Sequence, residues 1–122
     1  MTHPHDPYAM RATLRTDLAV AMKARNSRAV SALRTTIAAI DNAESVDPSE
    51  KITPGNAHIE GAATGLGAAE ATRRVLSPAD VRAILQAQID DRAAEADRYD
   101  SLGQAEAAGQ LRGEAEVLTT YL

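Results

Sequence analysis

The sequence predicts an all-α protein, a four-helix bundle-like domain of two antiparallel helical hairpins joined by a long loop that contains Gly and Pro. Alanine occupies 26 of the 122 positions, whereas Phe, Trp and Cys are absent. Strand-rich domains use β-branched and aromatic side chains, so this composition favours helices packed through small residues. Apolar residues also recur at three- and four-residue steps in four segments, as in amphipathic helices. A chain of this length holds one domain, which we expect at 8–122 after a flexible tail at 1–7.

The first hairpin is expected to contain helices over about 7–25 and 28–44. Asp6 followed by Pro7 is a typical helix start, because the Asp side chain accepts a hydrogen bond from a free backbone N–H and proline suits the first helical position. In the second helix, apolar residues form one narrow seam suited to a facing helix. Ser27 is expected to cap that helix.

The second hairpin is expected to contain helices over about 78–102 and 104–122. Ser77 precedes a proline and stands three positions before Asp80, a combination typical of a helix N-terminus. Gly103 stands where the first of these helices should end, and glycine readily adopts the left-handed conformation that ends a helix. Because the connection between them is short, the two helices are expected to be antiparallel.

Residues 45–76 are expected to form a long irregular loop, because prolines and glycines recur throughout this stretch. A short helical turn at about 68–74 is one exception. Loops of this length are uncommon in compact domains and are either functional or disordered. The composition of this stretch favours a disordered linker.

Composition and motifs exclude several classes of function. The absence of cysteine removes thiol chemistry and Cys-based metal sites. A pair of glycines at 65–67 lacks the preceding strand and the third glycine of a dinucleotide site, and the sequence holds no P-loop. His3, His5 and His58 lie in segments that are expected to be irregular, so neither a histidine base nor a metal site is supported. We therefore expect no catalytic residue, no metal and no cofactor.

The charge distribution makes the first hairpin the basic part of the chain. The formal net charge is −4, with a balance of +2 over 1–44, −1 over 45–76 and −5 over 77–122. A nucleic-acid contact would therefore use the first hairpin. No apolar run approaches the ~18 residues of a membrane span, and the N-terminus lacks the apolar core of a signal peptide. We expect a cytoplasmic protein without membrane contact.

The basic side chains of the first hairpin are candidates for binding nucleic acid or a partner. They are Arg11, Arg15, Lys23, Arg25, Arg28 and Arg34. Since no aromatic side chain stands among them, they would contact the RNA backbone and recognise its shape rather than unpaired bases. The alternative is an ordinary solvated helix face, partly neutralised by Asp17 and Asp41.

One charged residue is expected inside the second hairpin. Gln88 and Arg92 fall on the same helical stripe as the apolar residues that face the interior. A buried charge must be paired, because desolvating it alone costs several kcal/mol. Glu114, at the edge of the apolar face of the last helix, is the expected partner in a structural ion pair that fixes helix register. The alternative is a half-exposed polar cleft that presents Arg92 to a ligand.

Two blocks of residues, taken in their order and spacing, carry a family resemblance. The first comprises Met22-Lys23-Ala24-Arg25, Leu33-Arg34, Ala38-Ala39-Ile40 and Ala43-Glu44. The second comprises Ile84-Leu85-Gln86, Arg92, Tyr99, Leu102-Gly103, Glu114-Ala115-Glu116 and Tyr121-Leu122. Together they resemble the YqeY-like family (GatB/YqeY domain proteins), and the resemblance covers only the N-terminal helical domain of that family.

The resemblance implies a relation to the tail of the B subunit of tRNA-dependent amidotransferases. For the family it implies carbon–nitrogen ligase activity with glutamine as the amide donor, and tRNA or an amidotransferase complex as partner. Lys23, Arg34, Arg92 and Glu114 stand at motif positions, without an implied catalytic role. We expect a small YqeY-like accessory or interaction protein. The alternative is a direct tRNA-binding module that uses the basic face of the first two helices.

Binding of a partner protein, or self-association, is the competing mode of interaction. It would use a helical groove near Leu118, Tyr121 and Leu122. Exposure of these apolar side chains would favour this mode. A contiguous basic face on the first hairpin would favour RNA.

Overall fold

A computed structural model describes residues 3–45 and 74–122 of the chain. These residues form no strand and four helices, namely α1 (Pro7–Ala24), α2 (Ser27–Ser45), α5 (Pro78–Ser101) and α6 (Ala105–Thr119). The predicted all-α fold is confirmed for this part of the chain. Residues 46–73 lie outside the described residues, and with them lie most of the expected irregular loop, nearly all of the expected turn at 68–74, and His58.

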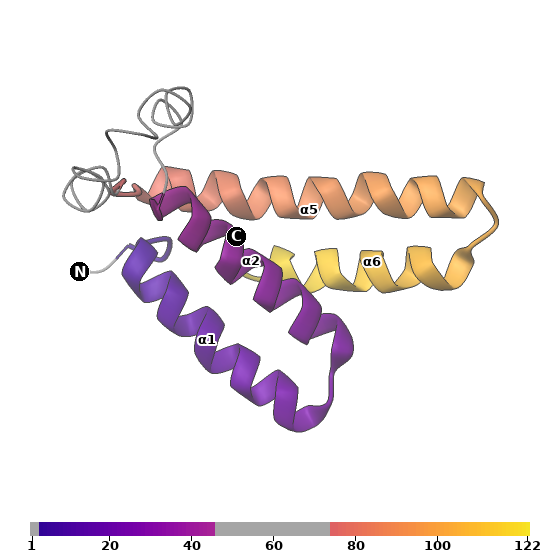
Figure 1. Ribbon diagram of the computed structural model, residues 1–122, viewed down its shortest axis with the longest axis horizontal. Coiled ribbons are helices and arrows are strands. Elements are labelled where there is room, and N and C mark those ends of the chain that lie inside the picture. Colours follow the sequence, from indigo (N-terminus) through magenta and orange to yellow (C-terminus); the bar gives the residue numbers. More distant parts are fainter. Residues whose placement is uncertain (1–2, 46–73) are drawn as a thin grey trace, which may run out of the picture.

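Helix α2 holds the two hairpins together. α1 and α2 form one hairpin, α5 and α6 run side by side as the other, and the first hairpin lies obliquely to the second (Figure 1). α2 packs against α1 and also against both α6 and α5. The arrangement therefore places every helix in contact with α2, while α5 and α6 share the most extensive of the helix–helix interfaces.

The observed helix starts agree with those predicted from the sequence, except at Ser27. Asp6 Oδ2 accepts a 2.9 Å hydrogen bond from the Ala9 amide, and α1 begins with proline. Ser77 and Asp80 form a reciprocal capping box at the start of α5, with bonds of 3.1 and 2.9 Å. The expected Ser27 cap is wrong. Asn26 Oδ1 accepts from the Ala29 amide at 3.2 Å, because Ser27 already lies inside α2.

Gly103 makes the sharp turn between α5 and α6 in the predicted way. Its φ of +77° lies in the left-handed region, which a glycine enters without steric cost. The Gln104 amide then donates to the Tyr99 carbonyl at 2.9 Å, and the Gly103 amide donates to the Asp100 carbonyl at 3.0 Å. This pair of bonds is the Schellman motif, which satisfies carbonyls at the end of α5.

The core consists of aliphatic side chains from all four helices, together with small residues that let the helices approach closely. The fully buried aliphatic residues include Leu14, Leu33, Ile40, Val81, Leu85 and Leu118. Alanines complete the interfaces, among them Ala32, Ala96 and Ala108, which are 0% exposed. Side chains of this kind pack helices without large aromatic residues, as the composition predicts.

The segment before α5 is tied to the end of α2. The Arg74 amide donates a 2.8 Å hydrogen bond to the Glu44 carbonyl. Two residues later, Leu76 is buried at 4% exposure and joins the core. The start of α5 is therefore fixed beside the end of α2, which helps to set how the two hairpins meet.

The expectation of a flexible N-terminal tail is wrong for His5, which is only 5% exposed. Its Nε2 lies 3.0 Å from the Tyr121 carbonyl oxygen, and its backbone amide donates to His3 Nδ1 at 3.0 Å. The segment before α1 is thereby held against the end of the described chain. This contact joins positions 116 residues apart, so no local sequence signal reports it.

Candidate functional site

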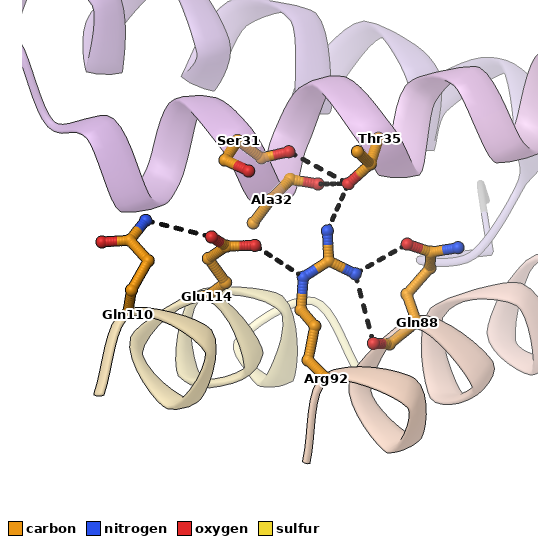
Figure 2. A network of polar contacts seen from close by, with 7 residues as sticks. All are labelled: Ser31, Ala32, Thr35, Gln88, Arg92, Gln110 and Glu114. Atoms are coloured by element: carbon orange, nitrogen blue, oxygen red, sulfur yellow. Dashed lines mark hydrogen bonds and ion pairs between the residues drawn. The ribbon is translucent and has the colours of Figure 1, made fainter. Parts of the chain in front are cut away.

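A polar network lies between α2, α5 and α6 and contains the expected ion pair (Figure 2). Arg92 Nε donates to Glu114 Oε1 at 2.9 Å. Arg92 Nη1 donates to both the carbonyl oxygen and the side-chain Oε1 of Gln88, at 3.2 and 2.7 Å. Arg92 Nη2 donates to the Thr35 hydroxyl. One guanidinium thus joins all three helices.

The surroundings of the Arg92–Glu114 ion pair indicate that it stabilises the fold rather than binds a ligand. The side chains of Arg92 and Glu114 are 10% and 8% exposed, and Gln110 Nε2 donates to the second Glu114 oxygen at 3.0 Å. All three guanidinium nitrogens already have protein partners, so a ligand could reach Arg92 only by displacing one. The alternative of a half-exposed cleft around Arg92 is therefore wrong. The helical stripe of inward-facing residues identified Gln88 from the sequence. No local pattern predicted that Thr35 or Gln110 would join the network.

Arg11 does not belong to an exposed basic face. Its Nε donates to Asp41 Oδ1 at 3.0 Å, its Nη2 pairs with Glu44, and its side chain is only 15% exposed. The hydrogen bond to Glu44 raises the pKa of Arg11 above its ordinary value. Arg15 is more exposed but lies 4.0 Å from the other Asp41 oxygen. These two arginines therefore serve the α1–α2 contact, and Arg11 is not available to a partner.

The remaining four candidates are exposed and lie around the turn between α1 and α2, or follow it on α2. We call Lys23, Arg25, Arg28 and Arg34 the basic corner. Arg34 Nη2 lies 4.0 Å from Met22 Sδ, which brings this part of α2 to the end of α1. Within the described residues, no ion pair joins any of the four to a carboxylate.

The cations elsewhere on the described surface are largely neutralised. Arg112 contacts Asp97 at 2.9 Å and Asp100 at 2.6 Å. Arg98 pairs with Glu95, and Arg74 lies 3.3 Å from Asp80. Arg82 forms no ion pair among the described residues, but its Nη1 donates to the Leu122 carbonyl oxygen at 3.3 Å. The second hairpin therefore offers an acidic surface on which most cations are paired with carboxylates, whereas none of the four cations of the basic corner is.

Arg25 occupies an unusual backbone position within the corner. Its φ of +56° and ψ of +38° lie in the left-handed helical region. The Asn26 amide donates to the Ala21 carbonyl at 3.0 Å, which closes the end of α1. Glycine is the usual residue at such a position, because a side chain there costs about 1–2 kcal/mol. The chain carries an arginine at this point.

The expected docking groove is wrong at Leu118. This residue is 0% exposed and belongs to the core, because the end of α6 packs its apolar face inward. Tyr121 and Leu122 are half-buried. A shallow groove of about 230 Å³ does lie beside Tyr121, with Val20, Ala21, Ala29, Leu33 and Val117 among its lining residues.

The described residues hold no group of three or more His, Asp or Glu side chains that could bind a metal ion. None of their helices is long and apolar enough to cross a membrane.

Comparisons with known proteins find no family model, no curated protein and no solved structure that matches this chain. The resemblance to the YqeY-like family stays a prediction.

Proposed function

We propose that this protein is a small cytoplasmic accessory protein that binds the sugar–phosphate backbone of tRNA through the basic corner. The observation that carries the proposal is the presence of four exposed cations, Lys23, Arg25, Arg28 and Arg34, without carboxylate partners among the described residues. Cations that neutralise phosphates release counterions from the RNA, which supplies binding free energy without base recognition.

The overall charge asymmetry supports the same surface. The chain carries a formal net charge of −4, so an RNA molecule would be repelled by much of the protein. The acidic helix α5 lies on the far side of α6 from the α1–α2 turn (Figure 1). RNA would consequently approach the end of the first hairpin, and the repulsion from the rest would orient the complex.

The conformation of Arg25 gives independent support. Strained backbone positions persist where a side chain is needed for function, and they cluster at binding sites. The left-handed Arg25 places a cation at the turn itself, where glycine would relieve the strain. A need for a positive charge at the turn would account for an arginine at this position.

The role in glutamine-dependent tRNA amidotransferase systems is proposed from the family resemblance alone. In this reading the protein assists a carbon–nitrogen ligase and is not itself the catalyst. The buried network around Arg92 contributes stability and helix register. The basic corner contributes contact with the substrate RNA.

Fluorescence anisotropy with labelled tRNA at about 50 and 200 mM salt tests the proposal. The double variant Lys23→Gln, Arg34→Gln is expected to bind about tenfold more weakly and to lower the salt slope by about 2, because each phosphate contact contributes about 0.9 to that slope. The control Arg82→Gln, Arg98→Gln removes the same charge from α5 and should retain the wild-type affinity. Equal loss in both variants, or no binding by wild type at the lower salt, would refute the proposal.

A further inference from the structure

Arg28 of the basic corner lies directly over a glycine of another helix. A methyl group added at Gly113 of α6 would come 2.6 Å from Arg28 Cδ, 2.9 Å from Nη1 and 3.1 Å from Nε. These separations are far shorter than ordinary van der Waals contacts of about 3.5–4.0 Å. The end of the Arg28 side chain therefore occupies the space beside α6 that a Cβ at position 113 would need.

Gly109 shows that this contact is specific to one glycine. It lies one turn earlier on α6, and a Cβ added there would meet nothing within 4 Å. Both positions carry glycine inside the same helix, where alanine is intrinsically preferred. A Cβ at position 113, unlike one at position 109, would therefore displace the Arg28 side chain.

We infer that Gly113 is a positioning residue for RNA binding: it seats Arg28 across α6 and so preorganises one cation of the basic corner. The inference rests on the proposed function of that corner. A guanidinium held against a helix backbone loses less conformational freedom when it binds a phosphate than a freely rotating one does. Through this contact α6 takes part in the site, although the basic residues themselves belong to α1, α2 and the turn between them.

The substitution Gly113→Ala separates positioning from charge and from folding. The atoms that clash belong to the flexible end of an arginine, so α6 can keep its path while Arg28 moves away. The net charge does not change. Gly109→Ala is the matched control, because it makes the same chemical change four residues away on the same helix without touching Arg28.

Two measurements test the inference. In tRNA anisotropy titrations, Gly113→Ala is expected to weaken binding about three- to tenfold, whereas Gly109→Ala should match wild type. In the Arg28→Gln background, Gly113→Ala should cause no further loss, because the two residues act through one contact. In the free protein, NMR relaxation of the Arg28 Nε–H group should show an ordered side chain in wild type and Gly109→Ala, and a mobile one in Gly113→Ala.

The outcomes distinguish this inference from the proposed function. If wild type binds tRNA through the corner but Gly113→Ala and Gly109→Ala behave alike, the positioning role is refuted and the function stands. The positioning role is also refuted if Gly113→Ala weakens tRNA binding as much in the Arg28→Gln background as it does in wild type. If wild type fails to bind tRNA, the proposed function and its positioning residue fail together, and the NMR comparison then shows separately whether Gly113 still orders Arg28.

Discussion

The Tyr121 hydroxyl donates a 2.5 Å hydrogen bond to Asp17 Oδ2, and this bond ties the residues after α6 to the middle of α1. The contact matters because α1 otherwise packs mainly against α2. Together with the contact between His5 and the Tyr121 carbonyl, it connects the first hairpin to the end of the second.

Tyr121→Phe is expected to destabilise the protein by about 1–2 kcal/mol, since it removes a hydrogen bond to a charged acceptor. Tyr8→Phe is the matched control, because Tyr8 is 81% exposed and its replacement should leave the melting temperature unchanged. Thermal unfolding followed by circular dichroism measures both. Equal melting temperatures for all three proteins would show that the bond contributes nothing.

The environment of Tyr121 also predicts that the free energy of unfolding falls at alkaline pH. Burial, assisted by the hydrogen bond to Asp17, raises the pKa of Tyr121 above its ordinary value of 10.0. The folded state therefore holds this proton more tightly than the unfolded state does. Stability conferred by this difference is complete below pH 10 and is lost as the pH rises above it. Chemical unfolding at about pH 9 and 11 should show a smaller decline for Tyr121→Phe than for wild type; an identical decline would contradict the raised pKa.

The buried pair of Arg92 and Glu114 should behave as a unit. Arg92→Met or Glu114→Met alone is expected to cost about 3 kcal/mol, because each leaves a buried charge without its partner. The double replacement should recover most of that loss, since apolar side chains of similar volume can substitute for a buried ion pair. Urea unfolding of the four proteins completes the cycle. Additive losses in the double variant would mean that the two residues contribute independently.

Arg25→Gly should change stability and binding in opposite directions. Glycine relieves the left-handed conformation at φ +56°, so the protein should gain about 1 kcal/mol of stability. Loss of the cation should weaken tRNA binding several-fold at the same time. Arg25→Ala serves as the control, because it removes the charge but keeps the strain. A variant that is both more stable and binds as tightly as wild type would argue against a role for Arg25 in the interface.

Local signals explain what the sequence could predict. Asp6, Ser77 and Gly103 act on backbone groups within a few residues of themselves, so the helix ends around them were predictable. The partnership of Arg92 with Glu114 was also predictable, because periodicity placed both on inward faces of adjacent helices.

Features that depend on distant contacts were not predictable in the same way. His5 is buried by Tyr121, and Arg11 is neutralised by Asp41 and Glu44, which lie at least 30 residues away from it. A list of basic residues therefore overestimated the basic face, since pairing is decided by how helices meet. The contact between Arg28 and Gly113 could not be predicted for the same reason, because neither local sequence indicates that the two residues meet.

The location of the RNA contact decides whether the basic corner is the binding surface. Two-dimensional ¹H–¹⁵N NMR spectra recorded during titration with tRNA would report every backbone amide of this 12.9 kDa protein. We expect shifts and line broadening at residues 22–34 and around Gly113, with α5 largely unaffected. Changes centred on α5, or no changes at saturating tRNA, would contradict the assignment of the basic corner as the RNA-binding surface.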